Sequence, residues 1–373
     1  MANKEEGLFA LLRLGIGINK ASDGDYSNLL NLNLTQWREL MNMAETQGVA
    51  AIAFDGVQEL YKTYQKNITA AKSTPTEWIQ WVFECTGMMT QYEQMNAQQK
   101  KVIAEVSGLL KENGIGMMVF KGQANASLYP HPAHRAPGDI DCFLFDNAEK
   151  GNELLRAQGA QINDRWYRHS KISYKGETIE NHRVMGHTRG SKIKQEMENE
   201  FRFMANSGGD LDARKVIEGC GEAFMPTAQF NACFLTYHGL HHFLTEGLRM
   251  KQVLDWVIFL KVCQNDVDWR EYKNFCMKYK LDKFAGVMNY IASDYFGIEL
   301  SVDIHTEGTY AEKIIQSTLF NDDYLFNSGK NDWAVRWLLV KNMLGRDRWK
   351  YEEIAQESVW KHLMGNFNGF VLG

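Results

Sequence analysis

The sequence predicts an α+β fold, with a small mixed β-sheet between a large N-terminal helical region and a large C-terminal one. Residues 1–114 and 206–373 carry their apolar side chains mostly at helical spacing. Residues 115–205 instead contain short apolar runs bounded by glycine, which is typical of buried strands. The 373-residue chain has only 5 prolines, as expected of a protein rich in helices. We therefore expect three domains with these boundaries.

The N-terminal region is expected to be helical throughout. Thr35 stands where it can cap a helix that carries its apolar residues on one face. The segments expected before the long helix are a helix over 8–14, a loop over 22–28, the helix capped by Thr35 and a helix over about 50–64.

The clearest local signal is the start of a long helix at Thr74. Pro75 follows at the first helical position and Glu77 lies three residues after the cap, which together form a capping box. Gly114 is the expected terminator. The apolar face of this helix either forms a dimerising coiled coil or lies across neighbouring helices and the sheet. Its bulky side chains favour the second interpretation: Trp78, Trp81, Cys85, Met88, Tyr92, Met95, Gln99, Val102, Val106 and Leu109.

Short apolar runs and turn residues define the central region. The first strand is expected over 116–120, and the Lys121-Gly122 turn follows it. Pro130 and Pro132 stop the short helix after this turn. The elements expected next are a helix over 123–129, a strand over 139–145, a helix over 147–158, strands over 171–174 and 178–183 joined by a hairpin turn, and a helix over 191–203.

The C-terminal region is expected to form a series of helices. They cover residues 226–243, 249–263, 268–279, 282–296, 311–320, 332–344 and 351–363. In the first of them His238 and His242 are four positions apart, and Glu246 extends the same face. Such spacing can bind zinc, but no fourth ligand accompanies it. We therefore favour a helical wall that is packed against the sheet, with some of its side chains facing a pocket.

Composition argues against several classes of protein. The net charge of −5 gives no reason to expect a nucleic-acid surface. The 6 cysteines are dispersed and form no Cys-x-x-Cys pair, so we expect reduced thiols and a cytoplasmic protein. No apolar run reaches the ~18 residues that span a membrane. The signatures of serine hydrolases, P-loop NTPases and dinucleotide-binding enzymes are missing from the sequence.

Two acids stand at alternate positions of the expected strand over 139–145. Asp139 and Asp141 therefore point the same way, roughly 6.5 Å apart at the backbone. Two like charges on an otherwise apolar strand are costly without a counter-ion, and oxygen ligands suit Mg²⁺. The alternative is an ordinary strand end with solvated acids. Glu180 and His182 repeat the alternation on a neighbouring segment.

These motifs resemble the nucleotidyltransferase-fold superfamily, in which a glycine-containing turn after the first strand precedes an acid-x-acid pair. More narrowly, they are similar to the bacterial family of uncharacterised nucleotidyltransferases, where the turn reads Lys-Gly, as at Lys121-Gly122. In that family a tyrosine and an arginine, here Tyr129 and Arg135, precede Gly-Asp-Ile-Asp. A third acid lies in a hydrophobic-acid-x-His motif, which 179–182 match.

The resemblance covers roughly residues 37–261 and implies transfer of a nucleoside monophosphate from an NTP to an acceptor. ATP is among the expected donors, and the acceptor is an unidentified small molecule or protein hydroxyl. Two Mg²⁺ ions would clamp the attacking and leaving oxygens. Asp139, Asp141 and Glu180 are the expected metal ligands and catalytic residues.

Three residues are expected to bind the nucleotide. Gly122 begins a helix whose free N–H groups suit a phosphate, and Lys121 adds a point charge there. Arg135, on the loop before the acids, is expected to contact phosphate. The alternatives are a surface lysine at a turn and a loop-stabilising salt bridge for the arginine.

The histidines complete the expected site. His182 either bridges to Glu180 or holds the acceptor, and the alternative to both is a structural histidine. His238 and His242 are expected to face the acceptor pocket or to support the catalytic groups. The resulting hypothesis is a Mg²⁺-dependent nucleotidyltransferase. The alternative is a catalytically inactive protein that keeps the fold for nucleotide binding or interaction.

Overall fold

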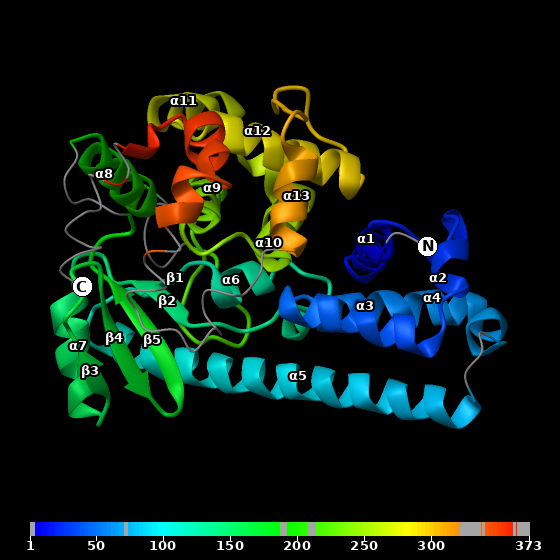
Figure 1. The fold of residues 1–373 in the computed structure, drawn as a ribbon. Coiled ribbons are helices and arrows are strands. Elements are labelled where there is room, and N and C mark those ends of the chain that lie inside the picture. The colour runs from blue at the N-terminus through cyan, green and yellow to red at the C-terminus, as the bar shows by residue number, and fades with distance from the viewer. Residues whose placement is uncertain are drawn as a thin grey trace.

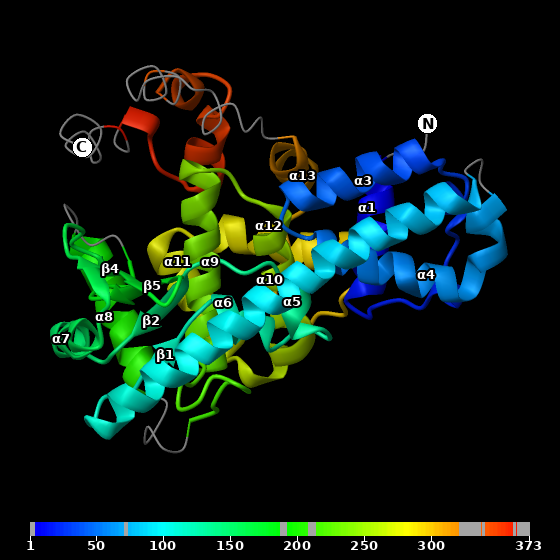
Figure 2. The same ribbon diagram turned by 90° about the horizontal axis from the view of Figure 1, so that it is seen from below.

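The computed structural model confirms the α+β fold (Figure 1). It describes residues 4–70, 74–186, 192–207, 214–320, 337, 340–360 and 363. A mixed sheet lies at one end of the molecule, the N-terminal helices lie at the other, and the C-terminal helices cover the sheet from one side (Figure 1). The long helix α5 (Pro75–Glu112) runs along the underside of the molecule from the N-terminal helices to the sheet (Figures 1 and 2).

The N-terminal helices pack through close contacts. Gly15 and Gly56 let α1 and α4 cross closely, because a Cβ at either position would collide with the backbone of the other helix, at Ile52 and Leu11. The expected cap Thr35 is wrong: Asn33 caps α3 and forms a capping box with Gln36. These elements are α1 (Lys4–Gly15), a 3-10 turn (Ala21–Asp23), α2 (Ser27–Leu30), α3 (Leu34–Thr46) and α4 (Ala50–Ala70).

Helix α5 confirms the capping box at Thr74 and carries its apolar face against this chain's own helices. Trp78 and Trp81 pack on Trp37 of α3, and Trp81 also meets Phe54 of α4. One prediction about this face is wrong, because Met95 is 52% exposed whereas Asn96 is buried. Asn96 occupies the inner position because its amide hydrogen-bonds the loop that leads to the sheet.

Within the described residues, the sheet has five strands in the order β1-β2-β5-β4-β3. Its central pair, β2 and β5, is parallel, and the other neighbouring pairs are antiparallel. Residue Phe224 extends the β1 edge through a backbone bridge to Met118. The strands are β1 (Met118–Val119), β2 (Ile140–Phe143), β3 (Gln161–Asn163), β4 (His169–Tyr174) and β5 (Glu177–His182). The mixed sheet is therefore confirmed, with β3 added to the expected strands.

Helices cover the two faces of the sheet with different side chains. One apolar cluster joins Ile140 and Cys142 of β2 to α5 and to α7 (Ala148–Ala157). On the other face Phe120 packs edge-on against Phe234 of α9 (Ala228–Thr245), which meets Phe201 of α8 (Lys192–Asn206). Polar residues of β2 that face α9 therefore lie between the sheet and the C-terminal helices.

Helices α10 (Met250–Cys263), α11 (Trp269–Tyr279) and α12 (Asp282–Tyr290) pack against α9. Phe9 of α1 touches Tyr295 and Phe296, so the N-terminal region also contacts the C-terminal one, and the division at 1–114, 115–205 and 206–373 stays an interpretation. No described helix has the length and apolarity to cross a bilayer. Other helices are α6 (Gly122–Ala126), a π-helix (Ile291–Tyr295) and α13 (Ala311–Leu319).

The last two expected helices have different outcomes. Most of residues 332–344 lie outside the described residues. The single helix expected over 351–363 is wrong at its start, where a π-helix covers Lys350–Ile354 and ends at Ala355. Gln356 then takes a φ of +50°, which breaks the helical path.

Candidate active site

Strand alternation gathers the polar residues on one face of the sheet. Asp141 and Glu180 stand directly beside each other in the parallel pairing of β2 and β5. Because Ile140 and Cys142 point to the α5 face, Asp141 points to the face that α9 covers. His182 lies two residues after Glu180 and shares its side of β5. The structure thus brings together the central acid, the third acid and the histidine of the expected site.

Asp141 is buried, and a different nitrogen-bearing side chain contacts each of its two carboxylate oxygens. Lys121 Nζ lies 2.9 Å from Oδ2, and His182 Nε2 lies 3.0 Å from Oδ1. Burial alone would raise the pKa of Asp141, but Lys121 and His182 together hold it below its ordinary value. The carboxylate is therefore ionised, as a metal ligand must be.

Asp139 lies immediately before β2, exposed at the mouth of the same pocket. Its pKa is raised, first by the loss of part of its solvent and next by the charge of Glu180. Asp139 and Glu180 therefore lie close enough for their negative charges to repel each other. A bound cation would relieve this repulsion.

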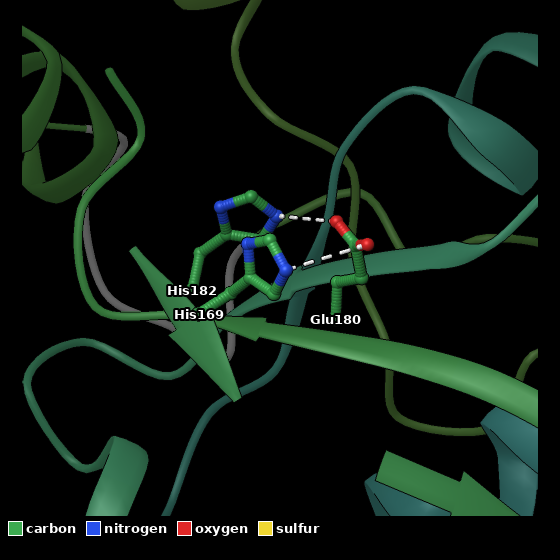
Figure 3. A group of neighbouring side chains, drawn as sticks. All are labelled: His169, Glu180 and His182. Carbon is green, nitrogen blue, oxygen red and sulfur yellow. Dashed lines mark ion pairs between the residues drawn. The ribbon is translucent and has the colours of Figure 1, made fainter. Parts of the chain in front are cut away.

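The Glu180 carboxylate faces two histidines, His169 and His182, whose rings lie next to each other (Figure 3). Its Oε1 is 3.5 Å from His169 Nε2, and its Oε2 is 3.6 Å from His182 Nε2. Burial would raise the pKa of Glu180, but the two neighbouring histidines, His182 first and then His169, lower it overall. Among the described residues, His169, Glu180 and His182 form a group whose potential ligand atoms lie within 4.8 Å of one another. Asp139 and Asp141 are not part of that group.

The Lys121-Gly122 turn joins β1 to the short helix α6 and has an unusual backbone. Lys121 has φ +60° and ψ −142°, a region that L-residues rarely adopt. Gly122 follows at φ +35°. Such strain costs about 1–3 kcal/mol and persists where the surroundings fix it. In this turn the ion pair between Lys121 and Asp141 offsets part of that cost, because the turn places the ammonium of Lys121 next to the carboxylate.

Arg135 is buried and paired rather than free to meet a ligand. Its Nε and Nη2 donate to the two oxygens of Asp255 on α10, each at 2.7 Å. Tyr129 donates to the same carboxylate at 2.9 Å. Burial opposes the charge of Arg135, but the Asp255 carboxylate raises its pKa above the ordinary value. The geometry fits the loop-stabilising interpretation, and Asn96 of α5 adds a bond to the carbonyl of Arg135 at 3.1 Å.

Helix α9 forms the opposite wall with the two expected histidines. The Nε2 atoms of His238 and His242 are 3.0 Å apart, and Glu246 lies 3.2 Å from Nδ1 of His242. Burial, helped by the charge of Lys121, holds the pKa of His238 well below its ordinary value, so His238 is neutral. Neither histidine belongs to the potential metal group among the described residues. The arrangement matches the favoured helical wall.

These residues enclose a cavity of about 430 Å³, within the ~300–1,000 Å³ of small-molecule sites. Sequence reasoning missed several of its lining residues, among them His169 and Lys251. Burial lowers the pKa of Lys251 to about 8, with the charge of Arg135 as the next cause. Within the described part of the chain, no hydrogen bond or ion pair of its ammonium is found. His169 lies two residues before Lys171 on β4, so the alternation of that strand could have indicated which way its side chain points. No pattern in the sequence around Lys251 distinguishes that residue.

Comparison with known proteins gives one match. Residues 33–297 match the family model described as uncharacterised nucleotidyltransferase. The matched span contains every residue of the cavity discussed above. Neither the search of curated proteins nor the search of solved structures finds a match.

Proposed function

The chain belongs to the uncharacterised nucleotidyltransferase family, and we propose that it transfers a nucleoside monophosphate from an NTP to a hydroxyl acceptor. In this reaction the acceptor oxygen bonds to the α-phosphorus. The bond from that phosphorus to the β-phosphate oxygen breaks, pyrophosphate leaves, and the hydroxyl proton is released. The acceptor is a small molecule or a protein side chain.

The observation that carries this proposal is the pairing of Asp141 with Glu180 on adjacent parallel strands beside Lys121. Carboxylates at these positions meet the needs of a divalent ion, and the ion pairs of Asp141 indicate a carboxylate that stays charged although buried. Asp139 at the pocket mouth adds a third oxygen donor. These hard oxygen ligands fit Mg²⁺.

We assign Asp139, Asp141 and Glu180 to hold Mg²⁺. When bound, such ions neutralise the triphosphate and stabilise the charge of the transferring group. The protein's own part is to fix the ligands: β2 and β5 hold Asp141 and Glu180 side by side, and His182 orients Asp141 through its 3.0 Å contact. Positioning of this kind is the larger share of catalysis in phosphoryl transfer.

The donor is proposed to lie along the cationic side of the cavity. Lys121 and Gly122 would meet the triphosphate, and Lys251 on α10 adds an amino group that was not expected from the sequence. Arg135 contributes from its salt bridge with Asp255 by holding the loop that carries Asp139. The α9 histidines His238 and His242 line the same cavity and are proposed to face the acceptor.

The proposed reaction is tested with NTPs labelled at the α-phosphate, incubated with the protein, Mg²⁺ and a cell extract. We expect label to appear in an acceptor, and to fall by about 100-fold or more in Asp139→Ala, since that variant loses a metal ligand. The same variant is expected to lose the Mg²⁺-dependent thermal shift that an NTP gives the wild type. No label and no shift with any of the four NTPs would contradict the proposal.

The alternative is a protein that keeps the site for binding and has lost the reaction. It predicts a thermal shift with NTP and no transfer of label. The feature that favours this alternative is the turn itself. In the superfamily the turn reads Gly-Gly or Gly-Ser, whereas here the strained Lys121 precedes Gly122. The six free thiols support a reducing, cytoplasmic setting for either function.

Lys251 provides a pH-dependent prediction. Its lowered pKa of about 8 means that the ammonium loses its charge as the pH rises through 8, so NTP affinity should fall between pH 7 and 9. Lys251→Met should weaken NTP binding about tenfold at pH 7 and remove this part of the pH dependence. Isothermal titration with each NTP measures both effects.

Lys251→Arg is the matched control, because arginine keeps its charge throughout this range. The folded pKa of Lys251 lies below its unfolded value of ~10.4, so the unfolded chain binds more protons between the two values. Stability of the ligand-free protein should therefore rise with pH in that window while NTP affinity falls. If stability and NTP affinity both fall as the pH rises, in the wild type and in Lys251→Met alike, Lys251 does not bind the NTP.

A further inference from the structure

Strand pairing, rather than sequence proximity, creates a second group of ligand atoms beside the proposed Mg²⁺ site. His169 on β4 stands directly opposite His182 on β5 in the antiparallel ladder. Glu180 lies two residues from His182 and so shares its face. The three side chains converge above the sheet (Figure 3). They open onto the cavity, so that an ion from solvent can reach them.

The spacing of these atoms suits a metal better than direct hydrogen bonds. The two Glu180 oxygens face different imidazoles, with N–O distances of 3.5 and 3.6 Å. Charge-assisted hydrogen bonds are shorter, about 2.7–2.9 Å. Two ligands bound to one ion at about 2.0–2.2 Å with a tetrahedral angle are about 3.4 Å apart. The observed separations fall close to this second value.

The orientation of the His182 ring also fits metal binding. Its Nδ1 lies 3.2 Å from the carbonyl oxygen of Val184, which can only accept, so Nδ1 carries the proton that is donated there. Nε2 then faces Asp141 and Glu180, where it donates to Asp141 while the ring is protonated and offers a lone pair to a metal ion when the ring is neutral. Metal-bound histidines show this pattern, with the distal N–H donated to a backbone carbonyl. The alternative is a protonated His182 that bridges the two carboxylates without a metal.

We propose that His169, Glu180 and His182 bind a transition-metal ion such as Zn²⁺. Imidazole nitrogen suits Zn²⁺, whereas Mg²⁺ and Mn²⁺ prefer oxygen ligands. Asp141, 3.0 Å from Nε2 of His182, is near enough to provide a further oxygen. This group shares Glu180 with the Mg²⁺ site of the proposed function. The pocket would then hold one ion bound partly through nitrogen next to a second ion bound through oxygen.

The test uses the full chain, freed of metal by chelation and dialysis, without nucleotide. Isothermal titration with Zn²⁺, Mn²⁺ and Mg²⁺ is followed by elemental analysis after gel filtration. We expect about one Zn²⁺ per chain, binding at least about 100-fold tighter than Mg²⁺. His169→Ala should weaken Zn²⁺ binding about 100-fold or more, and Co²⁺ in the same site should show the absorption bands of nitrogen ligation.

Two further variants decide between the interpretations. His169→Gln keeps the size and polarity of the side chain, so loss of Zn²⁺ in this variant, with an unchanged melting curve without metal, excludes a folding defect. His242→Ala removes a histidine of the α9 pair and should keep Zn²⁺ binding. Zn²⁺ binding that survives both His169 variants, or that disappears in His242→Ala, would overturn the proposal. Because no NTP is present, failure of the labelling experiment would leave this result unaffected.

Discussion

Replacing Asp141 with asparagine should lower nucleotidyl transfer by about 10²–10³-fold, the largest loss of activity expected from a single change in this protein. Asp141 is the buried acid at the centre of the site, with Lys121 and His182 on its two oxygens and Glu180 on the next strand. Asparagine keeps the shape and removes the charge, so a cation loses its central ligand. Transfer of label at saturating NTP and Mg²⁺ measures the effect.

The same variant also tests the electrostatics of the site. The folded pKa of Asp141 is lowered, so its ion pairs stabilise the wild type above the unfolded pKa of ~3.9 and lose this effect as pH falls through the folded value. Asp141→Asn should therefore lower the free energy of unfolding by about 1–3 kcal/mol at pH 7, and by less at pH 3. Urea denaturation at both pH values gives the comparison.

Asp303→Asn is the matched control, because Asp303 is exposed and lies far along the chain in the loop before α13. It makes the same chemical change without touching the cavity, and it should alter neither transfer nor stability. Wild-type transfer by Asp141→Asn would refute the catalytic assignment of this strand. A loss of stability without a loss of transfer would leave Asp141 as a purely structural group.

The parts of the site that follow a local pattern could be predicted from the sequence. Alternation on β2 and β5 placed Asp141, Glu180 and His182 on one face, because a strand has a fixed period of two. The capping box at Thr74 predicted the start of α5 for a similar reason, since it depends only on residues three apart. Local rules of this kind need no knowledge of the rest of the chain.

What the sequence did not predict depends on partners distant in the chain. Arg135 was expected at a phosphate, yet its partner Asp255 lies 120 residues later on α10. His169 enters the site only through the register of β4 on β5. On α5, the apolar pattern predicts that Met95 is buried, whereas hydrogen bonds to the carbonyls of Ala133 and Arg135 favour the polar Asn96 at the buried position. Tertiary hydrogen bonding overrides the apolar pattern at that position.

The pair of Arg135 and Asp255 gives the largest expected change in stability. Both side chains are buried and joined by two 2.7 Å hydrogen bonds, and Tyr129 and Asn125 also donate to the carboxylate. Removing one member of such a pair leaves an uncompensated buried charge. Asp255→Ala should therefore lower the free energy of unfolding by about 3–5 kcal/mol, measured by urea denaturation.

A double variant separates the two roles considered for Arg135. Arg135→Met combined with Asp255→Leu removes both charges and should recover most of the stability lost in Asp255→Ala, because no buried charge is then unpaired. Glu352→Gln breaks an exposed arginine–carboxylate pair with Arg348 and should leave the urea midpoint unchanged. If Arg135 only holds the loop, the double variant should regain NTP affinity together with stability. If Arg135 binds phosphate, the double variant should be stable and still bind NTP about tenfold more weakly, because the missing guanidinium would have been a ligand contact.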